Sequence, residues 1–465
     1  MIRRVVLLGL VAVLGAAACS GGSDSGTGDS AGGPDPSECG LEAFESADKP
    51  VGITFWHNFT DSNEEALEAM TDEFNTSQGD VTVDLVAFPG YEDIFTKWRA
   101  GIGGGDLPTM AVMEETTLQS MIDSRSAVPV QACVDADDYS LDDFLPQAVG
   151  YYTVDDVLYS MPWPVSNPVL FYNKTLFEDA GLDPEVPPAT LEEVREVSKQ
   201  IVDSGVAPHG ITIPTRDFIN EFWYAKGGQE YVNNGNGREG RATAAQLDNE
   251  FGLELWTWWN DMVESELALP TPAQGENIDH LLAVGNREAG MTIDGSAALG
   301  PALDVLSSGE FGGVELAAAV LPGVEEGGGV PVGDGSIWVS QAATPEQRGA
   351  AWQFVKYLSE PAQQVTLHLA GGYVPTRLSA IDDPAVQARW EEEPAFRFAV
   401  EQLVDSETTL ATVGSVIGDY QGVRNAVTKA LEGMLTGDLT PEEALAQAQE
   451  EADTAIQEYN TRIGE

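Results

Sequence analysis

The feature that most constrains the fold is a proline-rich stretch at residues 160–174, SMPWPVSNPVLFYNK. Pro162, Pro164 and Pro168 stand within seven residues. This spacing excludes a helix, because each proline lacks an amide hydrogen and holds the preceding residue extended. The run 169–172 is apolar and rich in residues that favour strands, so it predicts a buried strand. The stretch is therefore expected to be a stiff connector that enters a new layer of structure.

Strand and helix patterns alternate before this connector. Strands are predicted at 51–56, 81–85 and 107–113, with helices between them, and this order favours a mostly parallel sheet with helices on both faces. Ligands of such sheets bind beyond the carboxyl ends of the strands. Tyr91 and Glu114 follow strand ends, so both are placed to reach a cleft.

Two further patterns bear on fold and site. A later strand ends at Gly295 and Ser296, just before a helix, where free backbone amides suit an anion or a hydroxyl; a plain helix cap fits the same pattern equally well. Tryptophans at 256, 258 and 259 lie within a helix pattern and are interpreted as core.

The chain is strongly acidic. Its 465 residues exceed the usual size of one domain and fit two lobes. The net charge of −54 would repel nucleic acid and anionic membrane headgroups, so neither is an expected partner. The simplest interpretation of this charge is a solvated acidic surface that aids solubility.

The N-terminal segment indicates export. Residues 1–19 join a basic start to a short apolar run that ends in small residues before Cys19, which resembles a bacterial lipoprotein signal peptide with Cys19 as the lipidated residue. An ordinary cleaved signal with an incidental cysteine is the alternative. Residues 20–40 are expected to be a flexible tether. Cys39 and Cys133 suggest one disulfide, or else two unpaired thiols. The four histidines are scattered and indicate no metal cluster.

The connector, together with AGLDP at 180–184 and the loop GYVP at 372–375, resembles the bacterial extracellular solute-binding proteins, the receptors of ATP-binding-cassette importers. Within that group it is most similar to glycerol-3-phosphate and glycerophosphodiester binders. The resemblance runs from about Ile53 to the C-terminus. It implies an α/β, two-lobed periplasmic-binding-protein-like fold (type II) with a ligand cleft between the lobes. The expected segments are 41–163 and 296–358 in the first lobe, and 164–295 and 359–465 in the second.

The resemblance also implies a set of ligand contacts. Glu114 would accept two hydroxyl hydrogen bonds, and the two tyrosines would each offer a phenol and a flat apolar face. Arg424 would hold a phosphate through two parallel bonds, unless it serves only as an ion-pair partner in so acidic a chain. The implied contact residues are Tyr91, Glu114, Ser166, Gly295, Ser296, Asp334, Tyr373 and Arg424.

Two departures from the family pattern limit what the resemblance implies about the ligand. Asp334 stands where the family often has glycine, and a carboxylate there would bind sugar hydroxyls and repel phosphate. Residues 215–218 (TRDF) replace tryptophans of related binders, which would open the pocket to a larger ligand, and Arg216 could supply a second cation. The larger pocket would suit a glycerophosphodiester, and both departures also suit an oligosaccharide.

Three functions follow from these observations. The first is an importer receptor for a glycerol-phosphate compound, and the second is a receptor for a di- or oligosaccharide. The third is an exported glycoside-cleaving enzyme, but adjacent Glu114 and Glu115 in an extended segment would point opposite ways, and nothing identifies a second carboxylate. We therefore expect no catalysis and no cofactor. The protein is expected to be a monomer, lipid-anchored to the outer face of the cell membrane, that delivers its ligand to permease subunits.

Overall fold

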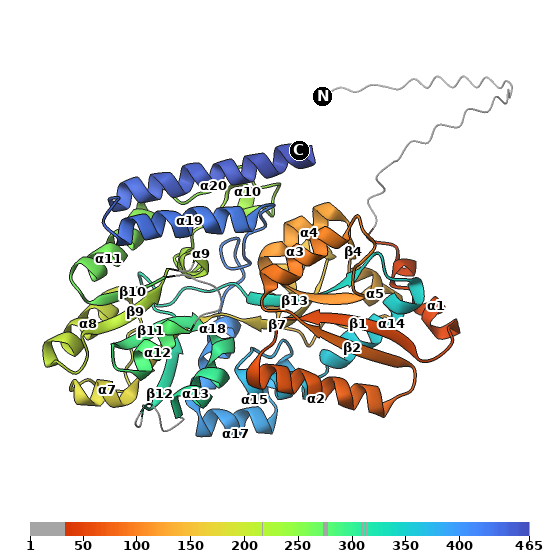
Figure 1. Ribbon diagram of the computed structural model, residues 1–465, viewed down its shortest axis with the longest axis horizontal. Helices are drawn as coiled ribbons and strands as arrows, with labels where there is room; N and C mark the ends of the chain where they lie inside the picture. Colours follow the sequence, from red (N-terminus) through yellow and green to blue (C-terminus); the bar gives the residue numbers. More distant parts are fainter. Residues whose placement is uncertain (1–32, 216, 273–277, 308–310, 312–313, 465) are drawn as a thin grey trace, which may run out of the picture. The chain divides into compact units, whose positions relative to one another are not determined.

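The computed structural model describes residues 33–464 except 216, 273–277, 308–310, 312 and 313. Cys19 and most of the expected tether lie outside the described residues. Two separate sheets organise the described part, and each has helices packed around it (Figure 1). We call the portion built on the first sheet the first lobe and the portion built on the second sheet the second lobe. This arrangement confirms the predicted two-lobed α/β fold.

The first sheet has the strand order β2-β1-β3-β13-β4, with β7 paired to β13. Strands β1, β2 and β3 are parallel, whereas β13 is antiparallel to β3, β4 and β7, so the sheet is mixed rather than mostly parallel. Its strands are β1 (Val51–His57), β2 (Val81–Ala87), β3 (Met110–Glu114), β4 (Ala127–Val128), β7 (Met161–Ser166) and β13 (Gly333–Ser340).

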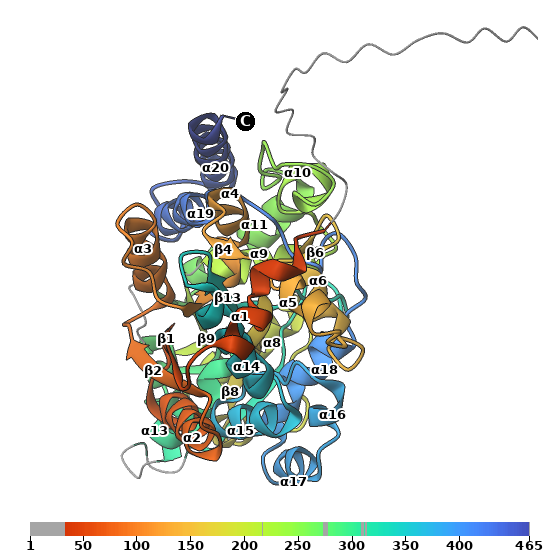
Figure 2. The ribbon, with the colours of Figure 1, turned by 90° about the vertical axis from the view of Figure 1, so that its right-hand side faces the viewer.

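Helices of the first lobe follow its strands or lie against its sheet (Figures 1 and 2). They are α1 (Leu41–Ser46), α2 (Asp61–Ser77), α3 (Tyr91–Gly101), α4 (Leu118–Ser124), α5 (Gln131–Ala136), α6 (Pro146–Tyr152) and α14 (Pro345–Leu358), with a small hairpin of β5 (Thr153–Val154) and β6 (Val157–Leu158). Helices α15 (Pro361–Gly371), α16 (Leu378–Ile381) and α17 (Pro384–Glu392) continue the chain after α14.

The second sheet has the strand order β10-β9-β11-β8-β12. Strand β8 is antiparallel to both of its neighbours, and β9, β10 and β11 are parallel. Its strands are β8 (Pro168–Asn173), β9 (His209–Pro214), β10 (Ala268–Thr271), β11 (Ala289–Gly295) and β12 (Leu316–Val320). The helices of this lobe are α7 (Lys174–Asp179), α8 (Leu191–Ser204), α9 (Asp217–Lys226), α10 (Asn233–Asn236), α11 (Glu250–Glu264), α12 (Asp279–Gly285), α13 (Leu299–Ser307), α18 (Phe398–Val404), α19 (Tyr420–Leu435) and α20 (Pro441–Ile463).

The proline-rich stretch carries the chain from one sheet to the other. Strand β7 belongs to the first sheet and β8 to the second, with Asn167 alone between them. Strand β7 pairs with β13 along one edge, and among the described residues its other edge makes the single bridge between Val165 and Val374. An edge that needs so few amide donors tolerates prolines. The predicted buried strand is confirmed as β8, in which every residue is buried.

The expected lobe segments differ from the sheets at two strands. The boundary expected between residues 163 and 164 divides β7, all of which belongs to the first sheet. Residues 296–358 were expected in the first lobe, but β12 lies inside that segment and pairs with β8 of the second sheet. The chain therefore crosses between the sheets again after β12, where residues 321–332 lead from β12 to β13. Trp256, Trp258 and Trp259 are buried in the core, as predicted. Helices α8, α14 and α20 begin with capping boxes at Thr190, Thr344 and Thr440.

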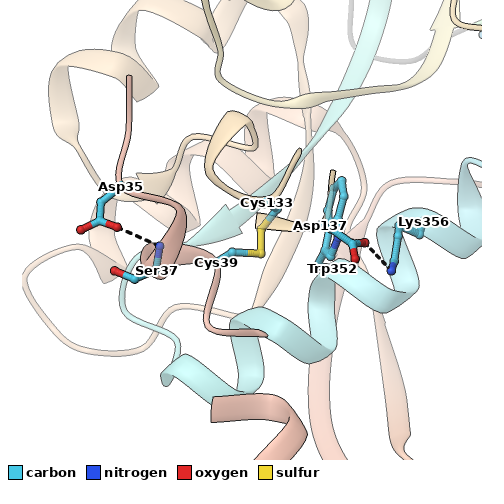
Figure 3. Close-up of a disulfide and its surroundings, with 7 residues drawn as sticks. All are labelled: Asp35, Ser37, Cys39, Cys133, Asp137, Trp352 and Lys356. Carbon is cyan, nitrogen blue, oxygen red and sulfur yellow. Dashed lines mark hydrogen bonds and ion pairs between the residues drawn. A yellow bond between two sulfur atoms is a disulfide. The ribbon is translucent and has the colours of Figure 1, made fainter. Parts of the chain in front are cut away.

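A disulfide joins the N-terminal end of the described chain to the first lobe (Figure 3). Cys39 and Cys133 are bonded, so the alternative of two free thiols is wrong. Cys39 ends a short 3₁₀ helix, Pro36–Cys39, and is fully buried. The tether was expected to extend to residue 40, but its last residues are part of the folded lobe because the disulfide and the core hold them. In the described part, no helix combines the length and apolarity that crossing a bilayer requires.

Candidate ligand-binding cleft

A cavity of about 350 Å³ lies between the two lobes. The residues that line it come from the ends of first-lobe strands, from the connector between β7 and β8, and from second-lobe helices. Most of the contact residues implied by the family resemblance line it. The lining residues on which the argument depends are Phe59, Asp61, Tyr91, Glu114, Glu115, Ser166, Phe218, Phe222, Asp294, Gly295, Asp334, Tyr373 and Arg424.

Tyr91 and Glu114 enter from the first lobe, as predicted. Tyr91 is the first residue of α3, and Glu114 is the last residue of β3. The Thr116 hydroxyl donates a hydrogen bond of 2.6 Å to Glu114 Oε2 and fixes that carboxylate. Among the described residues the buried Tyr91 hydroxyl has no hydrogen-bond partner, and burial raises its pKa well above the usual value. A neutral phenol without a partner at a cavity wall can bind a ligand oxygen.

Ser166, Gly295 and Ser296 meet where the chain crosses between the sheets. Gly295 pairs with Pro168, and a β-carbon at Gly295 would lie 3.4 Å from Ser166 Oγ. The free backbone donors expected here are not available, because Gly295 N donates to Asp294 Oδ1 and Ser296 N donates to the Asn167 carbonyl. The buried Ser296 hydroxyl has no partner within the described chain. Ser296 itself does not line the cavity, although both of its neighbours do.

Asp334 and Tyr373 both line the same cavity. Asp334 is the second residue of β13. Its φ of 65° is a left-handed conformation that glycine adopts more readily. Asp334 therefore holds its carboxylate at the cavity on a backbone conformation that favours glycine. Tyr373 packs its ring edge-on against Phe59, with the ring centroids 5.7 Å apart. The pair gives the cavity an aromatic wall.

Arg424 is the centre of an ion-pair cluster that spans the two lobes. Its Nη1 lies 2.9 Å from Glu114 Oε1, and its Nη2 lies 2.9 Å from Glu115 Oε1. Nη2 also donates to Glu221 Oε1. Glu114 and Glu115 belong to the first lobe, whereas Glu221 on α9 and Arg424 on α19 belong to the second. The guanidinium that was expected to hold a phosphate is thus bonded to three carboxylates.

This cluster is largely buried and contains three carboxylates but one guanidinium. Glu115 and Glu221 are 4% and 7% exposed, and Arg424 is 5% exposed. Burial, followed by the neighbouring Glu114, raises the pKa of Glu115 well above its usual value. Burial also raises the pKa of Glu221, and Arg424 opposes that rise. The arrangement therefore favours a proton on the cluster.

The expectation that Glu114 and Glu115 point opposite ways is wrong. Strand β3 ends at Glu114, and a 3₁₀ helix, Glu115–Thr117, begins at the next residue. The turn brings the Oε1 atoms of both side chains to the same guanidinium. The alternation of side chains along a strand does not apply across a strand end.

Sequence reasoning missed Asp61, Glu115 and Asp294 of the cavity lining and Glu221 of the ion-pair cluster. Glu115 was considered only as a catalytic partner, and Glu221 lies in a helix whose pattern carries no signal for a site. Asp294 accepts a hydrogen bond of 2.7 Å from the buried His280. Asp294 could have been found, because it stands at the end of strand β11 next to the predicted Gly295. Arg216, the suggested second cation, lies outside the described residues.

Comparisons with known proteins agree on a family. The profile of the bacterial extracellular solute-binding proteins matches residues 69–396. The sn-glycerol-3-phosphate-binding periplasmic protein UgpB of Brucella abortus (strain 2308) is 27% identical over 425 residues, which cover 90% of this chain and 95% of that protein.

Solved structures share the fold. The structure of UgpB from Mycobacterium tuberculosis in complex with glycerophosphocholine has a TM-score of 0.71 at 17% identity, covering 88% of this chain and 99% of that one. The cyclic α-maltosyl-1,6-maltose binding protein from Arthrobacter globiformis has a TM-score of 0.70 at 22% identity, covering 88% of this chain and 100% of that one. The glycerophosphocholine complex and the maltosyl-maltose binding protein are therefore about equally similar to this chain in fold.

Proposed function

The chain belongs to the family of bacterial extracellular solute-binding proteins, the ligand-capturing components of ATP-binding-cassette importers, and from that premise we propose that its cleft takes an uncharged, hydroxyl-rich ligand: a di- or oligosaccharide. Proteins of this family are exported, bind small ligands and deliver them to permeases, and are not enzymes. The remaining question is which ligand the residues of this cleft suit.

The observation that carries the proposal is the bonding of Arg424 to Glu114, Glu115 and Glu221. A phosphate would have to displace these carboxylates from the guanidinium and then lie beside them. Removing a partner from a buried ion pair costs about 3–5 kcal/mol, because the other charge is left unpaired. An uncharged ligand leaves the cluster intact and therefore avoids this cost.

The other charges of the cavity support the same ligand class. Among its described lining residues Arg424 is the only cation, whereas Asp61, Glu114, Glu115, Asp294 and Asp334 are acidic. Ionised carboxylates accept hydrogen bonds from hydroxyls through several lone pairs but repel an anion. Aromatic rings at the cavity wall cover the apolar faces of a bound ring.

A glycerol-phosphate compound is the second candidate. The curated relatives that favour it are named for sn-glycerol-3-phosphate and cover nine-tenths of this chain. A zwitterionic glycerophosphodiester such as glycerophosphocholine would suit the acidic cleft better than glycerol-3-phosphate, because its cationic group would lie among carboxylates. Its phosphate would still have to displace carboxylates from Arg424.

Isothermal titration calorimetry with maltose, trehalose, glycerophosphocholine and glycerol-3-phosphate tests the proposal. We expect heat of binding with at least one of the two sugars and none with glycerol-3-phosphate. Binding of the phosphate compounds alone would overturn the proposal in favour of the second candidate. Chromatography of each mixture after the titration serves as a check, since cleavage of any ligand would contradict a receptor role.

We propose that Cys19 carries a lipid anchor and that residues beyond it tether the folded part to the outer face of the membrane. The pattern of small residues before Cys19 supports this. Mass spectrometry of the mature N-terminus, after expression in a bacterium with a lipoprotein pathway, should find a lipid-modified cysteine. A mature chain that begins elsewhere, or with an unmodified Cys19, would contradict the anchor.

A further inference from the structure

A second cavity, of about 410 Å³, lies next to the first. Residues of α3 and α4 in the first lobe form one side of it, and residues at the N-terminal end of α19 and the C-terminal end of α20 form the other. Tyr91 and Glu114 line both cavities. These two residues form a wall that the cavities share, so the second cavity, which we call the side groove, adjoins the cleft.

The side groove combines aromatic faces with hydrogen-bonding edges. Phe95 is partly exposed, and the Arg99 guanidinium lies over its ring at 5.6 Å. On the opposite side Arg462 lies over the ring of Tyr459 at 5.1 Å. Aromatic rings bordered by polar groups are the surfaces on which a pyranose ring packs its apolar face while its hydroxyls bond at the rim. Thr96, Thr116, Thr117 and Gln421 add uncharged polar groups to the lining.

Bonds between the lobes hold the two sides of the groove in place. Arg241 of the second lobe donates to both carboxylate oxygens of Asp123 on α4, at 2.7 and 3.0 Å. Tyr459 on α20 donates to Asp123 Oδ2 at 2.8 Å. The Ser120 hydroxyl also donates to the carbonyl of Gly418. The groove is therefore formed by the same closed arrangement of lobes that forms the first cavity.

We propose that the side groove is a second subsite for the ligand of the cleft, so that the ligand is an oligosaccharide longer than two sugar units. This inference rests on the proposed function. One end of the ligand lies in the first cavity beside Asp334 and Tyr373. The chain of sugars passes Tyr91 and Glu114, and its other end packs against Phe95. The shared wall residues favour one continuous ligand over two separate ones.

A length series tests this inference. Maltose, maltotriose and maltotetraose are titrated calorimetrically into the wild-type protein, the Phe95→Ala variant and a matched Phe251→Ala control. Phe251 lies on α11, is partly exposed and packs against Tyr224, and it lines neither cavity. Thermal unfolding of each variant checks that it is folded.

We expect maltotetraose to bind the wild type and Phe251→Ala about tenfold more tightly than maltose, or more. In Phe95→Ala this gain from length should fall to about threefold or less. Equal affinity along the series, or a gain that survives Phe95→Ala, would overturn the subsite while leaving the proposed function standing. If neither these sugars nor trehalose binds, the proposed function fails and the subsite fails with it.

Discussion

At the scale of single residues, Asp334 contributes most clearly to the acidity of the cleft. Its φ of 65° suits glycine, yet the residue is an aspartate that lines the cavity. Together with the cluster around Arg424, it makes the cleft acidic. Arg424, which the family resemblance implied as a phosphate contact, is bonded to three carboxylates. Residue chemistry, rather than fold, therefore distinguishes the two candidate ligands.

The buried carboxyl of Glu115 should make stability depend on pH. Because its pKa is raised in the folded state, its contribution is fully present below the unfolded value near 4.5 and is lost as the pH rises through the folded value. We expect Glu115→Gln, which cannot ionise, to reduce the loss of unfolding free energy between about pH 5 and pH 8. The slope of unfolding free energy against pH should differ between the wild type and Glu115→Gln by up to about 1.4 kcal/mol per pH unit.

Urea unfolding at several pH values measures this slope. Glu92→Gln is the matched control, since Glu92 is an exposed residue on α3. Its stability curve should run parallel to that of the wild type. Parallel curves for Glu115→Gln as well would mean that this carboxyl does not retain a proton in the folded protein.

At the scale of elements, the short helix Pro36–Cys39 depends on its disulfide. Cys39 lies against α5 through Cys133, and the bond closes a loop across a sequence separation of 94 residues (Figure 3). Neighbouring contacts add to this attachment: Trp352 Nε1 and Lys356 Nζ of α14 both donate to Asp137, which follows α5. The N-terminal helix, α5 and α14 therefore form one packed corner of the first lobe.

Replacing Cys39 and Cys133 together by serine should lower the free energy of unfolding by about 2–5 kcal/mol, because a long loop in the unfolded chain is no longer closed. Thermal unfolding in the absence of reductant measures the effect. The wild type treated with a reductant should show a similar loss, whereas the double variant should not respond to the reductant. An equal melting temperature for all samples would show that the bond adds nothing to stability.

Some elements of the fold could be predicted from the sequence, whereas the ion-pair partners in the cleft could not. Strand β8 was predicted from a local pattern and is present, and the structure has the disulfide that was one of the two alternatives for Cys39 and Cys133. Strand β12 was assigned to the wrong lobe, because a local pattern does not say which sheet a strand joins. The partners of Arg424 could not be predicted, since Glu221 and Glu115 lie 203 and 309 residues away in the chain. Only the crossing of the chain between the sheets brings them together.

At the scale of the whole folded part, bonds between the lobes maintain the closed cleft. The Arg424 cluster lies at its centre, and the pair of Asp123 and Arg241 lies at the side groove. Arg238 donates to the carbonyls of Gly150 and Tyr151 near the C-terminal end of α6 and to those of Val413 and Gly414. Lobes of such proteins move by hinge bending, so contacts of this kind bias the closed state.

Removing one of these contacts should shift the balance toward open lobes. Arg241→Gln breaks the ion pair with Asp123, and we expect ligand dissociation to accelerate by about two- to tenfold. Small-angle scattering should also give a larger radius of gyration for the variant without ligand. Arg195→Gln is the control, because Arg195 pairs with Asp261 inside the second lobe. No change in either quantity for Arg241→Gln would mean that this ion pair does not favour closure.

The most direct test of the central claim, that the cleft selects an uncharged hydroxyl-rich ligand, is calorimetric titration of the wild type and Asp334→Gly with maltose, trehalose and glycerophosphocholine. Glycine fits the left-handed backbone, so the variant removes the charge without straining the chain. We predict that a sugar binds the wild type more tightly than glycerophosphocholine does, and that Asp334→Gly weakens the sugar about tenfold or more. Tighter binding of glycerophosphocholine than of either sugar by the wild type, unchanged in the variant, would contradict the account.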